Sequence, residues 1–235
     1  MTNQSDKIWA VVPAAGVGSR MGLGIPKQYL NVAGKPIIQH TIELLLGLDQ
    51  LVGVMVSISS EDHWFSNLNF NDERVSSTVG GSTRAISVLN GLNALDQSAA
   101  KQDWVLVHDA ARPCLSLSLL QDMVETIKAE PVGGIMAIKA KDTLKQAKAE
   151  NGVSYINTTI DRSAVWQAQT PQMIRYGELK KALNYCLDNN IATTDEASAL
   201  EQLGRPIRLF EGSADNIKVT TPEDQKLAEF VLGSL

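Results

Sequence analysis

Short apolar runs alternate along the chain with longer segments in which apolar residues recur at helical spacing. The runs are rich in Val and Ile, and they cover residues 8–12, 51–58, 74–79, 104–107 and 134–138. Between the first two runs, residues 36–47 carry apolar side chains three or four positions apart. Such alternation is typical of βαβ units. It predicts an α/β fold with a mainly parallel sheet and flanking helices.

Cap residues predict where the helices begin. The candidate N-caps are Ser82, Ser116 or Ser118, Thr193 and Thr221. Glu196 follows Thr193 at capping-box spacing, and Pro222 occupies a first helical position. A further helix is predicted over residues 176–188, and a short strand over residues 215–220.

The segment 139–157 differs from its surroundings because it is polar, rich in Lys and poor in residues that could face a core. We interpret it as a protruding hairpin or arm. The whole chain of 235 residues is then expected to form a single domain, with this arm at about 139–160.

Composition and charge exclude several classes of protein. A net charge of −5 argues against a general nucleic-acid binder, whose surface is usually basic. No apolar run reaches the ~20 residues that a membrane helix needs, and the polar start of the chain does not resemble a signal peptide. The two cysteines, Cys114 and Cys186, lie far apart without metal-ligand spacing. We therefore expect a soluble, cytoplasmic protein with reduced thiols.

The stretch from Pro13 to Gly22, directly after the first strand, is the most informative part of the sequence. Its small residues, among them Gly16 and Gly18, allow successive N–H groups to surround an anion. Met21 occupies the position of the third glycine in a dinucleotide-binding fingerprint, and the Gly-Lys-Ser/Thr ending of a P-loop is missing. Arg20 and Lys27 add two cations, which suits a triphosphate that gains charge during a reaction.

A second cluster, residues 108–113, follows an apolar strand. Ligands of parallel sheets bind outside the carboxyl ends of the strands, so this is a candidate site. Asp109 is a candidate ligand for Mg²⁺ or another divalent cation, and Arg112 a candidate phosphate-binding fork. The alternative is that Asp109 caps a turn and pairs with Arg112. We interpret His108 as structural.

Two weaker candidates remain. Gly81 and Ser87 flank a helix N-terminus that could contact a base or a ribose, although a simple capped helix start fits nearly as well. Near the C-terminus, Asp215 is a second candidate metal ligand, and Lys218 follows it.

These motifs together resemble the 2-C-methyl-D-erythritol 4-phosphate cytidylyltransferase family of the non-mevalonate isoprenoid pathway. The matching segments are residues 13–21, 26–29, 80–88, 107–113, 142–143, 161–162, 166–172, 194–201 and 215–224. Their order along almost the whole chain is far more specific than one glycine motif. The resemblance implies a Rossmann-like nucleotidyltransferase fold with a projecting β-arm. It also implies a homodimer in which the arms embrace.

The resemblance further implies roles for individual residues. Arg20 and Lys27 would stabilise the transition state of CMP transfer from CTP. The residues around the nucleotide would be Ala14, Ala15, Gly16, Gly18, Gly81 and Ser87. Those around 2-C-methyl-D-erythritol 4-phosphate would be Asp109, Arg112, Thr143, Arg162, Thr170, Thr194 and Lys218. Ser82 and Thr83 depart from the family pattern, since relatives often carry acidic residues there.

Two other functions compete with this one. A related cytidylyltransferase would take another polyol phosphate, such as ribitol 5-phosphate, and Arg162 and the arm would discriminate. A non-catalytic nucleotide-binding regulator would keep the fold without the reaction, but the joint presence of Arg20 and Lys27 disfavours it.

Overall fold

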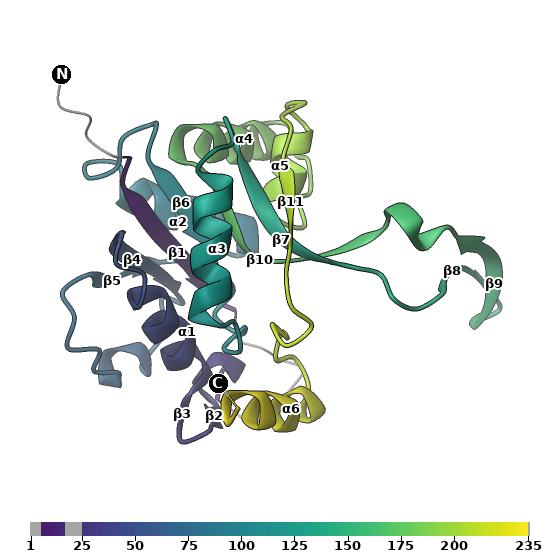
Figure 1. The fold of residues 1–235 in the computed structure, drawn as a ribbon, viewed down its shortest axis with the longest axis horizontal. Helices are drawn as coiled ribbons and strands as arrows, with labels where there is room; N and C mark the ends of the chain where they lie inside the picture. The colour runs from purple at the N-terminus through teal and green to yellow at the C-terminus, as the bar shows by residue number, and fades with distance from the viewer. Residues whose placement is uncertain (1–5, 17–24, 235) are drawn as a thin grey trace.

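The computed structural model describes residues 6–16 and 25–234, so Gly18 and Arg20 lie outside the described residues. Figure 1 shows a central sheet with helices against it and a long arm that projects to one side. Seven strands form the sheet in the order β11-β7-β10-β6-β1-β4-β5. Their bounds are β1 Ile8–Ala14, β4 Leu51–Ile58, β5 Val75–Val79, β6 Trp104–Val107, β7 Gly133–Lys139, β10 Trp166–Arg175 and β11 Arg208–Glu211.

The strands of this sheet are mainly parallel, as predicted. β1 pairs in parallel with β4 and β6, and β5 pairs in parallel with β4. β10 runs antiparallel between β6 and β7, and β11 is parallel to β7. β10 therefore runs in the opposite direction to β1 and β6.

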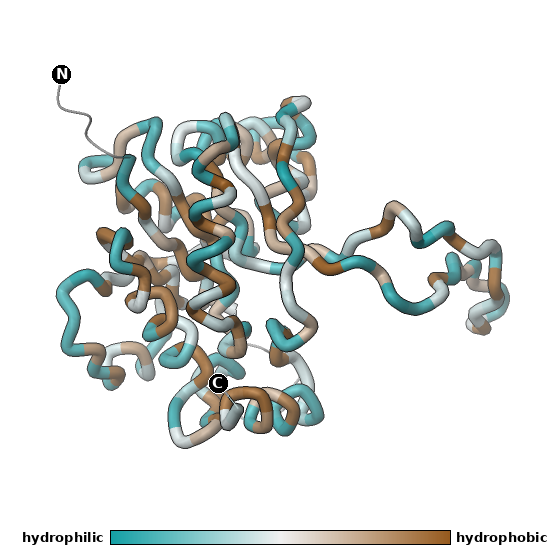
Figure 2. The backbone as a smooth tube through the Cα atoms, viewed as in Figure 1, coloured by the Kyte–Doolittle hydropathy of each residue, from teal (hydrophilic) through white to brown (hydrophobic). Residues whose placement is uncertain are grey.

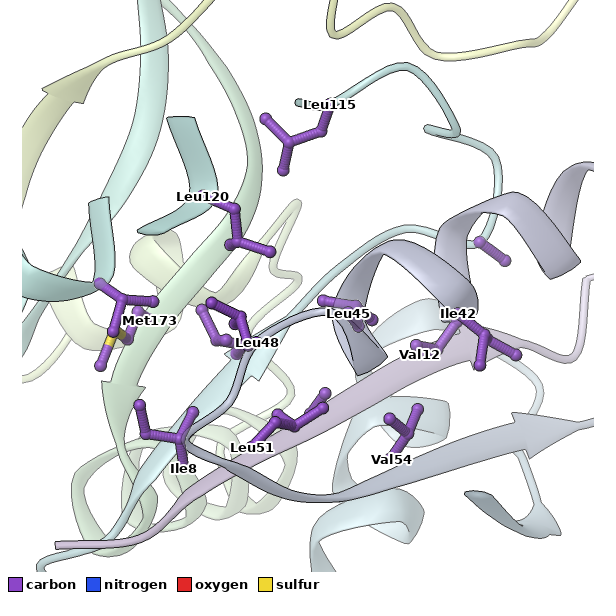
Figure 3. Close-up of a cluster of buried hydrophobic side chains, with 14 of the residues drawn as sticks. Ile8, Val12, Ile42, Leu45, Leu48, Leu51, Val54, Leu115, Leu120 and Met173 are labelled. Atoms are coloured by element: carbon purple, nitrogen blue, oxygen red, sulfur yellow. The ribbon is translucent and has the colours of Figure 1, made fainter. Parts of the chain in front are cut away.

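Helices cover both faces of the sheet because its central strands are apolar on both sides. Alternate residues of β1 divide between two cores: Ala10 and Val12 join one, and Val11 joins the other. The first core includes α1 (Ile37–Leu46) and α3 (Leu117–Ile127), and Figure 3 shows part of it. The second includes α2 (Arg84–Ala94) and α4 (Tyr176–Asp188).

The helix starts agree only partly with the predictions. Ser116 caps α3 and Thr221 caps α6 (Pro222–Leu232), as expected. The predicted cap Ser82 is wrong, because Thr83 Oγ1 accepts the hydrogen bond from the Ile86 amide.

Thr193 is also wrong as the cap of α5 (Glu196–Glu201). Asp195 and Ser198 form the capping box instead, so Glu196 is the first residue of the helix. Its side chain is thereby free to point into the protein, where it is 1% exposed. The Thr-x-x-Glu pattern fitted the spacing of a capping box but placed the helix two residues too early.

The sequence did not predict two strands of the sheet, and it predicted one strand that the structure does not have. β10 and β11 were not predicted, since Gln and Arg in these segments do not resemble a buried strand. The predicted strand over residues 215–220 is wrong, because this segment is not in a strand of the described chain. A buried Asn216 holds it instead: its Nδ2 donates to the Thr170 carbonyl at 2.8 Å.

The predicted arm is confirmed as a hairpin of β8 (Leu144–Glu150) and β9 (Val153–Ile160). Its turn is Asn151-Gly152, with φ of 50° and 78°, the left-handed values of a type I′ turn. All residues of β9 are exposed. In Figure 2 hydrophobic segments alternate with hydrophilic ones along the arm.

A β-bulge brings four apolar residues of the arm to the same side. Between Gln146 and Ala147 the register shifts, so no residue of β8 lies directly opposite Asn157. Because directly paired residues share a face, the shift puts Leu144 and Ile160 on the same side as Val153 and Tyr155. This side also carries the polar residues Gln146, Lys148, Glu150 and Thr158. We call its four apolar residues the apolar face of the arm.

The C-terminal helix α6 packs beside the segment that follows the glycine-rich loop. That segment consists of the 3-10 turn η2 (Lys27–Tyr29) and the strands β2 (Asn31–Val32) and β3 (Lys35–Pro36). Two short 3-10 turns complete the described elements, η3 (Phe65–Asn67) and η4 (Arg162–Ala164). Cys114 and Cys186 are both buried and form no disulfide. Within the described ranges, none of the helices has the length and apolarity to cross a membrane.

Candidate functional site

A cleft of about 360 Å³ opens where β1 and β6 end. Its position outside the carboxyl ends of parallel strands is the usual one for ligands of α/β sheets. The lining residues include six that were predicted for nucleotide binding or catalysis: Ala14, Ala15, Gly16, Lys27, Gly81 and Ser87. Ser82 and Thr83, where the chain departs from the family pattern, also line it.

Local contacts explain why the two sides of this cleft approach each other. The side chain of Gln28, which is buried, donates to the Ala14 carbonyl at 2.8 Å. This bond fixes η2 against the end of β1 and places Lys27 on the cleft. On the other side, the Gly81 amide donates to Ser87 Oγ at 3.0 Å, which shapes the start of α2.

Gly80 is required for this approach. A Cβ built at this residue would lie 2.5 Å from the Cβ of Ala15, closer than real contacts allow. A larger residue would push the β5–α2 turn away from the loop that follows β1.

Four charged side chains form a wall beside the cleft. Arg84 donates from Nε to Asp109 Oδ1 at 2.9 Å, and its two terminal nitrogens donate to the Glu196 carboxylate at 2.6 and 3.0 Å. Lys218 Nζ lies 2.7 Å from Asp109 Oδ2. We call Arg84, Asp109, Glu196 and Lys218 the charged wall.

The wall consists of groups that are costly to bury singly but that compensate one another. Burial disfavours the charged form of Asp109, yet Arg84 and Lys218 overcome this effect and hold its pKa well below the ordinary value. Burial also opposes the charge of Arg84, but Glu196 and Asp109 raise its pKa. Asp109 is therefore an anion with both oxygens occupied.

A second cavity, of about 240 Å³, lies on the other side of the same wall. Arg84, Asp109 and Lys218 line both cavities. The second cavity is also lined by Arg112, Thr170 and Thr194. The structure thus brings together five of the residues expected around the polyol phosphate: Asp109, Arg112, Thr170, Thr194 and Lys218.

Two hydrogen bonds join the C-terminal segment to Ala111 and Arg112, which line the first and the second cavity respectively. Arg112 Nη1 donates to the Asn216 carbonyl at 2.6 Å, and the Val219 amide donates to the Ala111 carbonyl at 2.8 Å. Lys218 lies between these anchor points, which explains how a lysine of an irregular segment reaches Asp109.

Thr143 and Arg162 do not join the other candidates in this chain. Both are exposed and neither lines either cavity. Thr143 directly precedes β8, and the Arg162 guanidinium contacts the carbonyl of Lys141. They belong to the arm, which Figure 1 shows extending away from the sheet.

The predicted metal ligands do not fit a cation in this arrangement. Both carboxylate oxygens of Asp109 already contact cationic side chains, and Asp215 is exposed and lines neither cavity. In residues 6–16 and 25–234, no group of three or more His, Cys, Asp or Glu side chains is suited to a metal ion. A protein-bound Mg²⁺ at these two aspartates is therefore not supported.

Sequence reasoning missed Arg84 and Glu196. Arg84 ends a motif whose glycines and helix start carry the prediction, and Glu196 fits the spacing of a capping box. The two residues are 112 positions apart, so their pairing leaves no local signal in the sequence. A buried Gln172 orients α5 for this contact: it donates to Asp195 at 2.8 Å and accepts from the Ala197 amide at 2.9 Å.

Comparisons with known proteins all point to the same enzyme family. The family model for 2-C-methyl-D-erythritol 4-phosphate cytidylyltransferase matches residues 8–234. Curated proteins of that name are similar, from Pseudomonas putida (49% identity, 95% of each chain) and Vibrio parahaemolyticus (46%, 95% of this chain and 94% of the other). The crystal structure of that enzyme from Francisella tularensis is similar with a TM-score of 0.83, at 37% identity over 96% of this chain and 99% of the other.

Proposed function

The chain belongs to the 2-C-methyl-D-erythritol 4-phosphate cytidylyltransferase family, and we propose that the two adjoining cavities are where it performs that reaction. The enzyme forms 4-diphosphocytidyl-2-C-methyl-D-erythritol and pyrophosphate from CTP and 2-C-methyl-D-erythritol 4-phosphate, in isoprenoid precursor biosynthesis. The observation that supports the location is that three residues of the charged wall, Arg84, Asp109 and Lys218, line both cavities. Ligands in the two cavities would lie next to each other.

Transfer of CMP to the substrate phosphate requires little acid or base catalysis. The second pKa of a phosphate monoester is about 6, so the attacking phosphate is already ionised at neutral pH. Its oxygen attacks the α-phosphorus of CTP, and the bond from that phosphorus to the bridging oxygen of pyrophosphate breaks. The protein must therefore align two anions and disperse their charge.

The residues of the two cavities suit this task. In our proposal, CTP occupies the larger cleft, next to Ala14, Ala15, Gly16, Gly81 and Ser87. Lys27, which lines this cleft, stabilises charge that develops on the phosphates, together with Arg20 from outside the described residues. The polyol phosphate occupies the smaller cavity, where Arg112 and Lys218 supply positive charge.

A divalent cation such as Mg²⁺ would enter with the nucleotide. Since Asp109 and Asp215 do not fit as its ligands, we propose that phosphate oxygens of CTP hold it. Bound in this way, the cation would neutralise part of the charge of the triphosphate. Location in the cytoplasm stays a prediction from the sequence.

We also propose that the active enzyme is a homodimer. The apolar face of the arm includes Val153 and Tyr155, each 50% exposed, and Ile160, 40% exposed. Such a face on a two-stranded hairpin needs a partner to cover it. A second copy would cover it with its own arm, and each arm would bring Thr143 and Arg162 to the partner's smaller cavity.

A pyrophosphate-release assay tests the reaction. CTP, UTP, ATP and GTP are each combined with 2-C-methyl-D-erythritol 4-phosphate and with ribitol 5-phosphate. We expect release only from CTP with the methylerythritol substrate. Faster turnover of ribitol 5-phosphate would support the related polyol-phosphate enzyme instead, and no turnover of any pair would support the non-catalytic regulator.

Mixing two inactive variants tests the shared site. If the arm of one copy serves the cavity of the other, Thr143→Arg and Lys27→Ala chains recover part of the activity when subunits exchange. Each heterodimer then holds one site with neither lesion. If exchange is demonstrated and no activity returns, each protomer uses its own arm and the proposal is wrong.

A further inference from the structure

His108 lies at the end of β6, where the charged wall begins, and its side chain is fully buried. Its two ring nitrogens have different partners. Nε2 lies 3.2 Å from the Arg112 carbonyl oxygen, and Nδ1 lies 2.9 Å from Thr170 Oγ1. The Asp109 amide donates to the same Thr170 oxygen at 3.0 Å. His108 thus connects three of the residues that line the smaller cavity.

The protons in this network can be assigned by elimination. A carbonyl oxygen only accepts, so His108 Nε2 must carry the hydrogen that it shares with Arg112. Burial lowers the pKa of His108 to about 4, and a neutral imidazole carries one hydrogen. Nδ1 is then an acceptor, and the Thr170 hydroxyl must donate to it.

The consequence concerns what Thr170 offers to a ligand. A hydroxyl has one hydrogen and two acceptor positions. The hydrogen of Thr170 is used by His108, and one acceptor position is used by the Asp109 amide. The remaining function of this oxygen toward the smaller cavity is to accept a hydrogen bond.

We propose that His108 is a positioning residue that fixes the Thr170 hydroxyl as an acceptor, so that Thr170 recognises a hydroxyl group of the polyol and not its phosphate. Phosphate oxygens of the dianion accept hydrogen bonds and offer none, whereas the hydroxyl groups of a polyol donate. The donors for the phosphate are Arg112 and Lys218, which line the same cavity. The inference rests on the proposed placement of the polyol phosphate there.

The direct test is the tautomer of His108. Two-bond ¹H–¹⁵N NMR spectra of the full-length protein at neutral pH distinguish the two ring nitrogens. His40→Gln and His63→Gln assign the third histidine by elimination, so His108 itself need not be changed. We expect a protonated Nε2 and an unprotonated Nδ1. A protonated Nδ1 would overturn the proposal, because Thr170 could then donate to the ligand.

Steady-state kinetics supply the second test. Thr170→Val keeps the shape of the side chain and removes the acceptor, so it should raise KM for 2-C-methyl-D-erythritol 4-phosphate roughly tenfold, the value of one buried hydrogen bond. KM for CTP should change little, and Thr170→Ser should restore the polyol KM. An equal rise of both KM values, or no rescue by serine, would leave Thr170 a merely structural residue.

The positioning role of His108 has its own matched pair of variants. His108→Asn keeps an acceptor near the position of Nδ1, whereas His108→Leu removes both ring nitrogens. The polyol KM should rise clearly more in the leucine variant, with melting temperatures recorded for both. Equal polyol KM values would contradict positioning through Thr170. If the unchanged protein shows no cytidylyltransferase activity, the proposed function fails, but the tautomer remains measurable.

Discussion

The charged wall and the arm differ in how their charged side chains are buried and paired. In the wall, Glu196 is 1% exposed and Asp109 is 7% exposed, and each carboxylate is paired within the chain. In the arm, every residue of β9 is exposed, and the ion pair of Lys148 with Glu150 lies in solvent. Charge in the wall therefore determines the stability and geometry of the site, whereas charge in the arm mainly keeps an exposed hairpin soluble.

The largest expected difference between the two regions is in stability. Glu196→Gln removes the carboxylate that pairs with both terminal nitrogens of Arg84 and leaves Arg84 only Asp109, which Lys218 shares; breaking such a buried pair costs ~3–5 kcal/mol. The matched change in the arm, Glu150→Gln, should cost about 0–1 kcal/mol. Denaturant unfolding of both variants gives the two free energies. Similar losses would mean that Glu196 is better solvated than its burial indicates.

A lysine of the cleft and a lysine of the arm should differ in catalysis. Lys27→Ala is expected to lower kcat roughly 100- to 1000-fold, by analogy with the loss of one donor that stabilises transition-state charge. Lys145→Ala removes a similar charge from the side of the arm opposite its apolar face and should leave kcat unchanged. The measurement is CMP transfer at saturating CTP. A normal kcat for Lys27→Ala would remove this residue from the catalytic set.

Acidification should also act on the site and not on the arm, because residues 139–160 contain no histidine. The folded-state pKa of His108, about 4, is below the ordinary value of ~6.5. Between these values the unfolded chain binds a proton that the folded chain does not, so stability falls as the pH falls through this window, by roughly 3 kcal/mol in total.

Unfolding free energies measured from pH 7 to pH 5 check this expectation. The His108→Asn variant should show a flatter dependence, since it has no proton to bind there. An equally steep dependence in that variant would assign the effect to other groups.

The smallest effect on the stability of the chain is expected at the arm's apolar face. Tyr155→Asp changes an exposed residue, so the free energy of unfolding should change by about 0.5 kcal/mol or less. The same variant should lose the proposed dimer in sedimentation experiments. Ser154→Asp, on the opposite face, is the matched control and should stay dimeric. Loss of the dimer in both variants would not support a specific role for the apolar face.

Local patterns predicted the parts of the fold that depend on local structure. The strand at 51–58 and the helix at 176–188 match their predicted bounds, because each has a clear period and clear ends. β10 was missed because its apolar pattern is interrupted by Gln169 and Gln172, which are buried by partners from other segments. Such compensation is tertiary and cannot be recognised from a window of sequence.

The same limit applies to the site. Lys27 was found because it follows the first strand closely in the sequence and lines the same cleft as Ala14, Ala15 and Gly16. Asp109 was found, but its role as a carboxylate held by Arg84 and Lys218 depends on contacts 25 and 109 positions away. The sequence therefore identified the carboxylate and assigned it a metal that the structure does not support.

The two buried cysteines have a practical consequence for spectroscopy. Burial raises the pKa of Cys114 to about 11 and that of Cys186 above its ordinary value, so both native thiols should react slowly with alkylating reagents at neutral pH. A cysteine introduced at Asn151, at the tip of the hairpin, would then be the preferred point of attachment for a fluorophore or a spin label. Little label should therefore attach to the native cysteines when the distance between two arm tips is measured.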